Sequence, residues 1–238
     1  MLRDAFRAVH ENVGALLLFL MVDMPLTFVV AAGNEFYLEP RREAMDERVL
    51  GLVQIGIDVL QVFVYAAIVS IVFSRLARNI DRPLWKVHGD GDALARFFPM
   101  WLLLTFICVA FLRFGQTFFE SGQEDFGGVL QVIGMLLITM VIPFGAIVTF
   151  LGNGRGEDLR VAVSILPRVI DRFLLAMLIG FFQFNLMAEL YTSEGTEYWM
   201  RPLIAALDVY MDCVVFSYIF LACREQRDLE EPIDPYDL

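Results

Sequence analysis

The sequence predicts an all-α fold: a polytopic membrane helical bundle of six transmembrane helices in three hairpins, with short amphipathic interfacial helices on the cytoplasmic side. Three observations predict it. Hydrophobic residues make up 58% of the chain, above the roughly 45–50% of soluble domains. They come in runs of about twenty, the length that spans a hydrocarbon core. Basic residues gather between alternate runs, as they do in loops on one side of a membrane.

The apolar runs set the predicted spans and domain. Each is long enough to cross about 30 Å of hydrocarbon at about 1.5 Å per residue. A single transmembrane domain is expected over residues 1–224, followed by an acidic tail, residues 225–238, that is predicted to be disordered. The predicted spans are residues 13–33, 50–73, 98–114, 128–151, 173–191 and 203–223.

Orientation follows from the positions of lysine and arginine. Thirteen of the 18 basic residues lie on the side of the two termini, and five lie on the other side. Because basic residues in short loops stay in the cytoplasm, both termini are predicted to be cytoplasmic, and the membrane is predicted to be a bacterial inner membrane. The first run is too long for the apolar region of a cleavable signal peptide, so it is expected to be retained.

Amphipathic segments precede the odd-numbered spans. Apolar residues at helical spacing alternate with charges in residues 2–13 and 159–169, and residues 84–96 form a poorer copy interrupted by Gly89 and Gly91. Such segments are typical of helices lying in the membrane interface. The chain is therefore divided into three hairpins, and whether these are true internal repeats stays open.

Charged residues inside spans are the most informative for function, because each costs several kcal/mol unless it is paired, neutralised or hydrated. Asp208 and Asp212 are four residues apart and share one helix face. Helix rise places all six charged residues between the midplane and the outer surface. The predicted polar cluster comprises Asp23, Asp58, Asp208, Asp212, Arg113 and Glu189, with Gln54, Gln61, Gln183 and Asn185 as supporting uncharged groups.

Two interpretations of this cluster remain open. In one, the carboxylates face a hydrated cavity, bind a cation or pass on a proton, and use Arg113 as a counter-ion. In the other, the polar groups pair across helices and only fix their packing. Pro25 and Pro143 are predicted to kink the first and fourth spans. Such prolines either remain static kinks or expose backbone carbonyls to a ligand.

Motifs for other chemistry are missing from the sequence. Cys108, Cys213 and Cys223 form no CxxC pair, and His10 and His88 are isolated, so no metal or cofactor is expected. The glycines of residues 152–156 follow an apolar run and lack the Gly-Lys-Ser/Thr ending of a phosphate loop. Net charge is −11, so nucleic acid is not an expected partner.

Three functions are compatible with this pattern. The first is a non-enzymatic accessory, scaffold or assembly subunit that packs against lipid, other membrane proteins or a second copy of itself. The second is a small transporter or channel whose intramembrane carboxylates bind a cation or proton. The third is a membrane enzyme acting on lipid headgroups. The second function requires the acids to face one cavity, and the first requires dispersed or paired acids.

Overall fold

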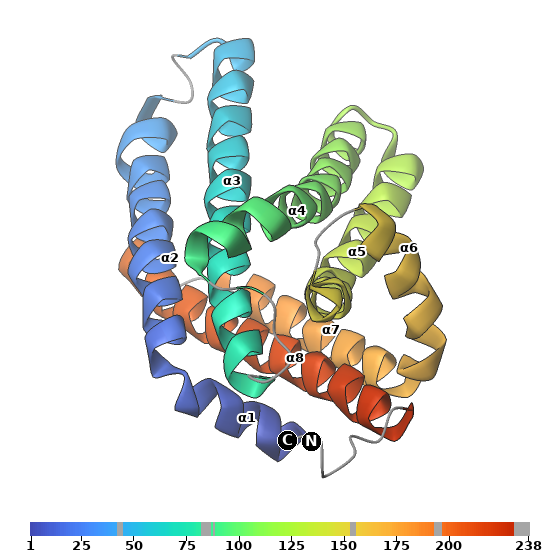
Figure 1. Cartoon of the computed structure of the whole chain (residues 1–238). Coiled ribbons are helices and arrows are strands. Elements are labelled where there is room, and N and C mark those ends of the chain that lie inside the picture. Colours follow the sequence, from blue (N-terminus) through green and yellow to red (C-terminus); the bar gives the residue numbers. More distant parts are fainter. Residues whose placement is uncertain (42–44, 82–86, 88, 153–155, 193–196, 231–238) are drawn as a thin grey trace.

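The computed structural model describes residues 1–41, 45–81, 87, 89–152, 156–192 and 197–230. Within these residues the protein is helical and contains no strand (Figure 1). Six of the helices in this part of the chain are long and apolar enough to cross a membrane. The protein is therefore an integral membrane protein with an all-α fold.

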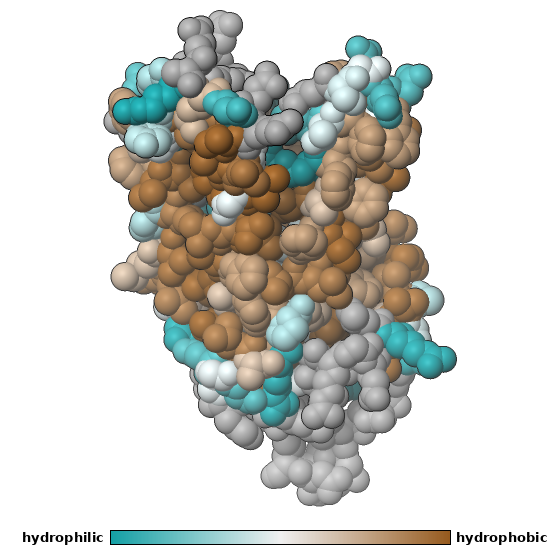
Figure 2. Space-filling model, turned by 90° about the horizontal axis from the view of Figure 1, so that it is seen from above, coloured by the Kyte–Doolittle hydropathy of each residue, from teal (hydrophilic) through white to brown (hydrophobic). Residues whose placement is uncertain are grey.

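The long helices contain the predicted spans in order. They are α2 (Val13–Gly33), α3 (Glu47–Ile80), α4 (Asp90–Glu120), α5 (Glu124–Leu151), α7 (Ile170–Thr192) and α8 (Arg201–Glu230). In Figure 2, a wide apolar band separates hydrophilic residues at two opposite ends of the molecule. This distribution fits a hydrocarbon layer around the middle of the helices.

Shorter elements connect the long helices. Two are α-helices, α1 (Leu2–Glu11) and α6 (Gly156–Ile165). A π-helical turn, Asn34–Leu38, and a 3₁₀ turn, Glu39–Arg41, follow α2, and further 3₁₀ turns lie at Leu166–Arg168 and Tyr198–Met200. α1 packs against α8, where the rings of Phe6 and His10 lie 6.2 and 6.0 Å from the Tyr210 ring.

Two segments predicted to lie outside the long helices belong to them. Residues 90–96 belong to α4 and continue into its span without a break, because Gly91 falls in the first turn, beside two aspartates that favour a helix N-terminus. Residues 225–230 continue α8 and were not expected to be ordered. Residues 84–86 and 88 of the predicted interfacial segment lie outside the described residues, as do residues 231–238 of the tail.

An aromatic column joins α3, α4 and α8 at the centre of the bundle. The Phe73 ring stacks on Phe216 at 4.3 Å and meets the edge of Trp101 at 5.3 Å. All three side chains are fully buried. Offset and edge contacts of this kind add about 0.5–1.5 kcal/mol per pair beyond burial. The column fixes how α3, α4 and α8 pack against one another.

α4 and α5 approach each other closely through glycines of α5. A Cβ atom at Gly134 would lie 2.8 Å from Leu112, and one at Gly127 would lie 2.5 Å from the Phe119 backbone nitrogen. At Gly145 a Cβ atom would overlap the Trp101 ring. Small residues allow this approach between membrane helices. Any larger side chain at these positions would push the two helices apart.

Ion pairs join α3, α4 and α8 at a polar region that we call the arginine junction (Arg75, Arg78, Asp81, Asp90 and Arg227). Arg227 binds both carboxylate oxygens of Asp81, at 2.9 and 3.2 Å. Arg75 binds both oxygens of Asp90, at 2.5 and 3.1 Å, and Arg78 adds a contact of 3.2 Å. Bidentate pairs of this kind are strong and directional.

Candidate functional site: a carboxylate-lined cavity

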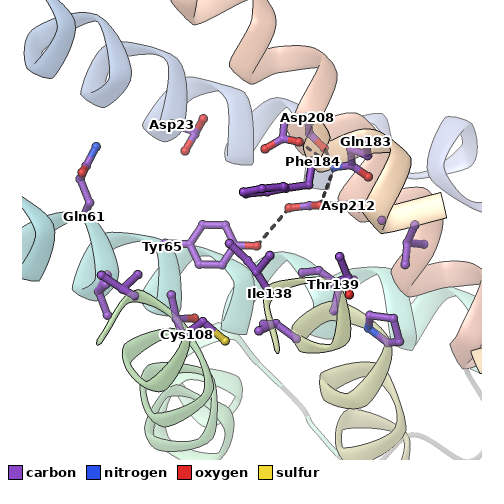
Figure 3. A pocket seen from close by; sticks show the side chains of 18 of the residues that line it. Asp23, Gln61, Tyr65, Cys108, Ile138, Thr139, Gln183, Phe184, Asp208 and Asp212 are labelled. Carbon is purple, nitrogen blue, oxygen red and sulfur yellow. Dashed lines mark hydrogen bonds between the residues drawn. The ribbon is translucent and has the colours of Figure 1, made fainter. Parts of the chain in front are cut away.

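A cavity of about 310 Å³ lies among α2, α3, α4, α5, α7 and α8. We call it the polar cavity, after the polar side chains in its otherwise apolar wall (Figure 3). Every long helix therefore contributes to it. Its polar lining residues are Asp23, Thr27, Gln61, Tyr65, Thr105, Thr139, Gln183, Asp208 and Asp212.

Two carboxylates of α8 share one amide donor in this cavity. Gln183 Nε2 on α7 donates to Asp208 Oδ1 at 2.7 Å and to Asp212 Oδ1 at 3.0 Å. The same nitrogen lies 3.2 Å from the Asp208 backbone oxygen. The four-residue spacing places both acids on one face of α8, and Gln183 fixes that face against α7.

Tyr65 of α3 supplies a second donor to the acids. Its hydroxyl group donates to Asp212 Oδ2 at 3.0 Å, so each oxygen of the Asp212 carboxylate accepts a hydrogen bond. In Figure 3 the Tyr65 hydroxyl points toward Asp212, and the Phe184 ring lies beside the two acids. Asp212 is therefore held in one orientation by donors from α3 and α7.

Asp23 of α2 faces the same cavity from another side. In Figure 3 Asp23 lies between Gln61 on one side and the two α8 acids with Gln183 on the other. No residue in the described part of the chain donates a hydrogen bond to the Asp23 carboxylate. Asp23, Asp208 and Asp212 are all half-buried, which leaves their oxygens able to contact a ligand.

Positive charge is missing from the described wall of the cavity. None of its lining residues is Arg, Lys or His. Burying carboxylates without a counter-ion inside a membrane protein costs several kcal/mol, which two uncharged donors offset only in part. No three His, Cys, Asp or Glu side chains in the described residues come together as a metal site. The described wall therefore holds three acids and no basic residue.

Asp58 and Arg113 form a separate pair and do not line the polar cavity. Arg113 Nη2 donates to Asp58 Oδ1 at 2.6 Å, and Arg113 Nε lies 2.5 Å from Asp58 Oδ2. Gln54 donates a long hydrogen bond of 3.5 Å to Asp58, and Gln116 accepts from Arg113 at 3.2 Å. Arg113 therefore neutralises Asp58 and is not the counter-ion of the other acids.

The remaining predicted site residues lie elsewhere. Asn185 is exposed and donates to the Phe181 carbonyl of its own helix at 2.7 Å. Glu189 is also exposed and does not line the cavity. α2 and α5 continue as α-helices past Pro25 and Pro143, so neither proline divides its helix. Pro143 is buried and lines the cavity, whereas Pro25 is exposed.

The sequence prediction missed several cavity residues, above all Tyr65, Thr105 and Phe184. A signal for Tyr65 was available, because the α3 residues Gln54, Asp58, Gln61 and Tyr65 follow spacings of four, three and four and form one polar stripe. The structure shows that this stripe serves two sites: its first half meets Arg113, and its second half faces the polar cavity. Thr105 and Phe184 have no such pattern.

Comparisons of the chain with protein-family models, curated proteins and solved structures gave no significant match.

Proposed function

We propose that the protein is a small membrane transporter or channel that binds a cation in the polar cavity. The observation that carries the proposal is the convergence of three carboxylates, Asp23, Asp208 and Asp212, on one cavity whose described wall holds no basic residue. An arriving cation would offset part of their negative charge at the depth where uncompensated charge costs most. This gives the site affinity without any catalytic chemistry.

The arrangement supports this function over the two alternatives. An accessory or scaffold subunit needs acids only as structural pairs, and Asp58 with Arg113 fits that role. Asp208 and Asp212 are four residues apart on one helix and meet only uncharged donors, which is a poor way to stabilise packing. A headgroup enzyme would need Arg113 beside these acids, and Arg113 does not line the cavity.

The proposal includes a membrane orientation. We place both ends of the chain in the cytoplasm of a bacterium, with the helices in three hairpins across the inner membrane and α1 and α6 in the interface. The excess of arginine on that side supports this orientation. Lipid is then a constant partner of the outer apolar faces, and the binding of other membrane proteins or a second copy remains compatible with transport.

Flux measurements with the purified full-length protein in liposomes test the function. Protons, Na⁺, K⁺ and the quaternary ammonium benzyltrimethylammonium are each given a gradient, with an imposed membrane potential. We expect protein-dependent flux of at least one of these cations, and Asp212→Asn should lower it by about tenfold or more, since tenfold corresponds to only about 1.4 kcal/mol.

The matched control is Glu189→Gln, which removes a carboxylate from α7 outside the polar cavity. This variant should retain wild-type flux. Flux equal to protein-free liposomes for all four cations would overturn the proposal. Equal loss of flux in the Asp212 and Glu189 variants would also overturn it, because the effect would then not depend on the cavity.

A further inference from the structure

The wall of the polar cavity has an acidic part and an apolar part. Its acids come from α2 and α8, while α4 and α5 contribute Val109, Ile138 and Ile142 to the wall. A bare metal ion or proton gains no binding energy from contact with such an apolar surface. A ligand that combines a positive charge with a hydrocarbon body would contact both parts of the wall.

The volume also exceeds what an inorganic ion needs. At about 30 Å³ per water molecule, 310 Å³ corresponds to roughly ten waters. The value lies at the lower end of the roughly 300–1,000 Å³ typical of small-molecule sites. Because no three carboxylate, thiol or imidazole groups in the described residues are close enough to hold a metal ion, a small organic ligand fills the space better.

Aromatic rings stand where the charged end of such a ligand would lie. The hydroxyl group of Tyr65 reaches Asp212 at 3.0 Å, and the Phe184 ring lies next to the two α8 acids in Figure 3. Rings of this kind attract ammonium groups through their π faces, and proteins commonly use them to recognise quaternary ammonium ions. Carboxylates and rings together favour a substituted ammonium.

Two polar groups at the cavity have no partner in the described part of the chain. Asp23 accepts no hydrogen bond there. The hydroxyl oxygen of Thr105 is shielded from solvent and also lacks a hydrogen-bond partner. Native proteins satisfy nearly all such groups. The Thr105 oxygen is closed off from the cavity space, whereas Asp23 is half-buried and faces it, so Asp23 is the group that a ligand would complete.

We propose that the polar cavity binds a monovalent organic cation with an apolar body, its ammonium group among Asp23, Asp208 and Asp212 and its body against α4 and α5. This inference rests on the proposed function and specifies its substrate class. A protonated or quaternary amine of about ten to fifteen non-hydrogen atoms matches the volume.

Binding is tested with the full-length protein in mild detergent, using three probes at matched concentrations. Benzyltrimethylammonium carries both features, its uncharged isostere neopentylbenzene carries only the body, and Na⁺ carries only the charge. We expect benzyltrimethylammonium to raise the melting temperature in a saturable way, and we expect the other two probes to bind at least about tenfold more weakly.

Variants separate the two halves of the site. Asp212→Asn and Asp23→Asn should each weaken benzyltrimethylammonium binding by about tenfold. The near-isosteric Val109→Thr should weaken it by about threefold and leave tetramethylammonium binding unchanged, because only the larger probe reaches that wall. Asp23→Asn serves as the second acid variant if Asp212→Asn fails to fold, since the Asp23 carboxylate accepts no hydrogen bond within the described residues.

Failure of this inference differs from failure of the proposed function. If Na⁺ or protons show Asp212-dependent flux and benzyltrimethylammonium does not bind, the substrate class is wrong and cation transport stands. If neopentylbenzene binds as tightly as benzyltrimethylammonium, the carboxylates do not recognise charge and the inference is overturned. If benzyltrimethylammonium binds through Asp212 but no cation crosses the liposome, the substrate class stands and transport is wrong.

Discussion

The acids of the polar cavity and those of the arginine junction have opposite environments. At the junction, Asp81 and Asp90 each bind arginine through both carboxylate oxygens. In the cavity, Asp208 and Asp212 receive hydrogen bonds only from Gln183 and Tyr65 among the described residues. Each junction acid is thus paired with arginine, whereas the two α8 acids meet no basic residue in the described part of the chain. Pairing with arginine therefore separates the acids that join helices from those that face the cavity.

The largest effect on stability is expected at the junction. Asp81→Asn should lower the free energy of unfolding by about 2–3 kcal/mol, because it leaves the Arg227 guanidinium without its bidentate partner. Denaturation with sodium dodecyl sulfate in mixed micelles measures this change. The double variant with Arg227→Gln should recover part of the loss. The exposed acid Glu11 provides the control, and Glu11→Gln should change stability little.

If Asp81→Asn were as stable as Glu11→Gln, the junction would contribute nothing and the comparison would fail.

A tenfold difference is expected between the rates at which a cationic and an anionic thiol reagent label a cysteine in the cavity wall. In a protein without its native cysteines, Thr27→Cys in the cavity wall should react with a trimethylammonium methanethiosulfonate about tenfold faster than with the sulfonate analogue, relative to their rates on a free thiol. The negative field of the acids concentrates the cation. Labelling rates followed by mass measurement give the ratio.

Asn79→Cys, an exposed position on α3 beside the junction, is the counterpart. Its ratio should be near one because arginine and carboxylate charges offset each other there. The same ratio at both positions would show that the cavity has no distinctive field.

The smallest effect is expected at Asp208. Asp208→Asn should raise the free energy of unfolding by about 0.5–1 kcal/mol, because it removes one of two neighbouring carboxylates. The Asn oxygen can still accept the hydrogen bond of Gln183. The same denaturation experiment measures it. If Asp208→Asn lowered the free energy of unfolding as much as Asp81→Asn, the fold would depend on the Asp208 charge. Asp208 would then be a structural acid like those of the junction.

Hydropathy was sufficient to predict the six spans, because the length of an apolar run is a property of one segment. The pairing of Asp208 with Asp212 was equally local, since it depends only on the helical repeat. The partner of Arg113 was not predictable in this way. Six charges were expected in one cluster at a common depth, and the structure gives Asp58 to Arg113 and leaves Asp23 with the α8 acids. Depth follows from sequence position, but lateral placement depends on how helices cross.

The glycines of α5 constrain how the cavity can change shape. Gly127 and Gly134 bring α5 so close to α4 that even a Cβ atom at either position would collide with α4, and Gly145 packs directly against the Trp101 ring. Sliding or hinging between these helices would drive side chains into main-chain atoms. If the protein transports a cation as proposed, we expect α4 and α5 to move as one unit. Opening of the cavity would then require movement of α2, α7 or α8, the helices that carry its acids and Gln183.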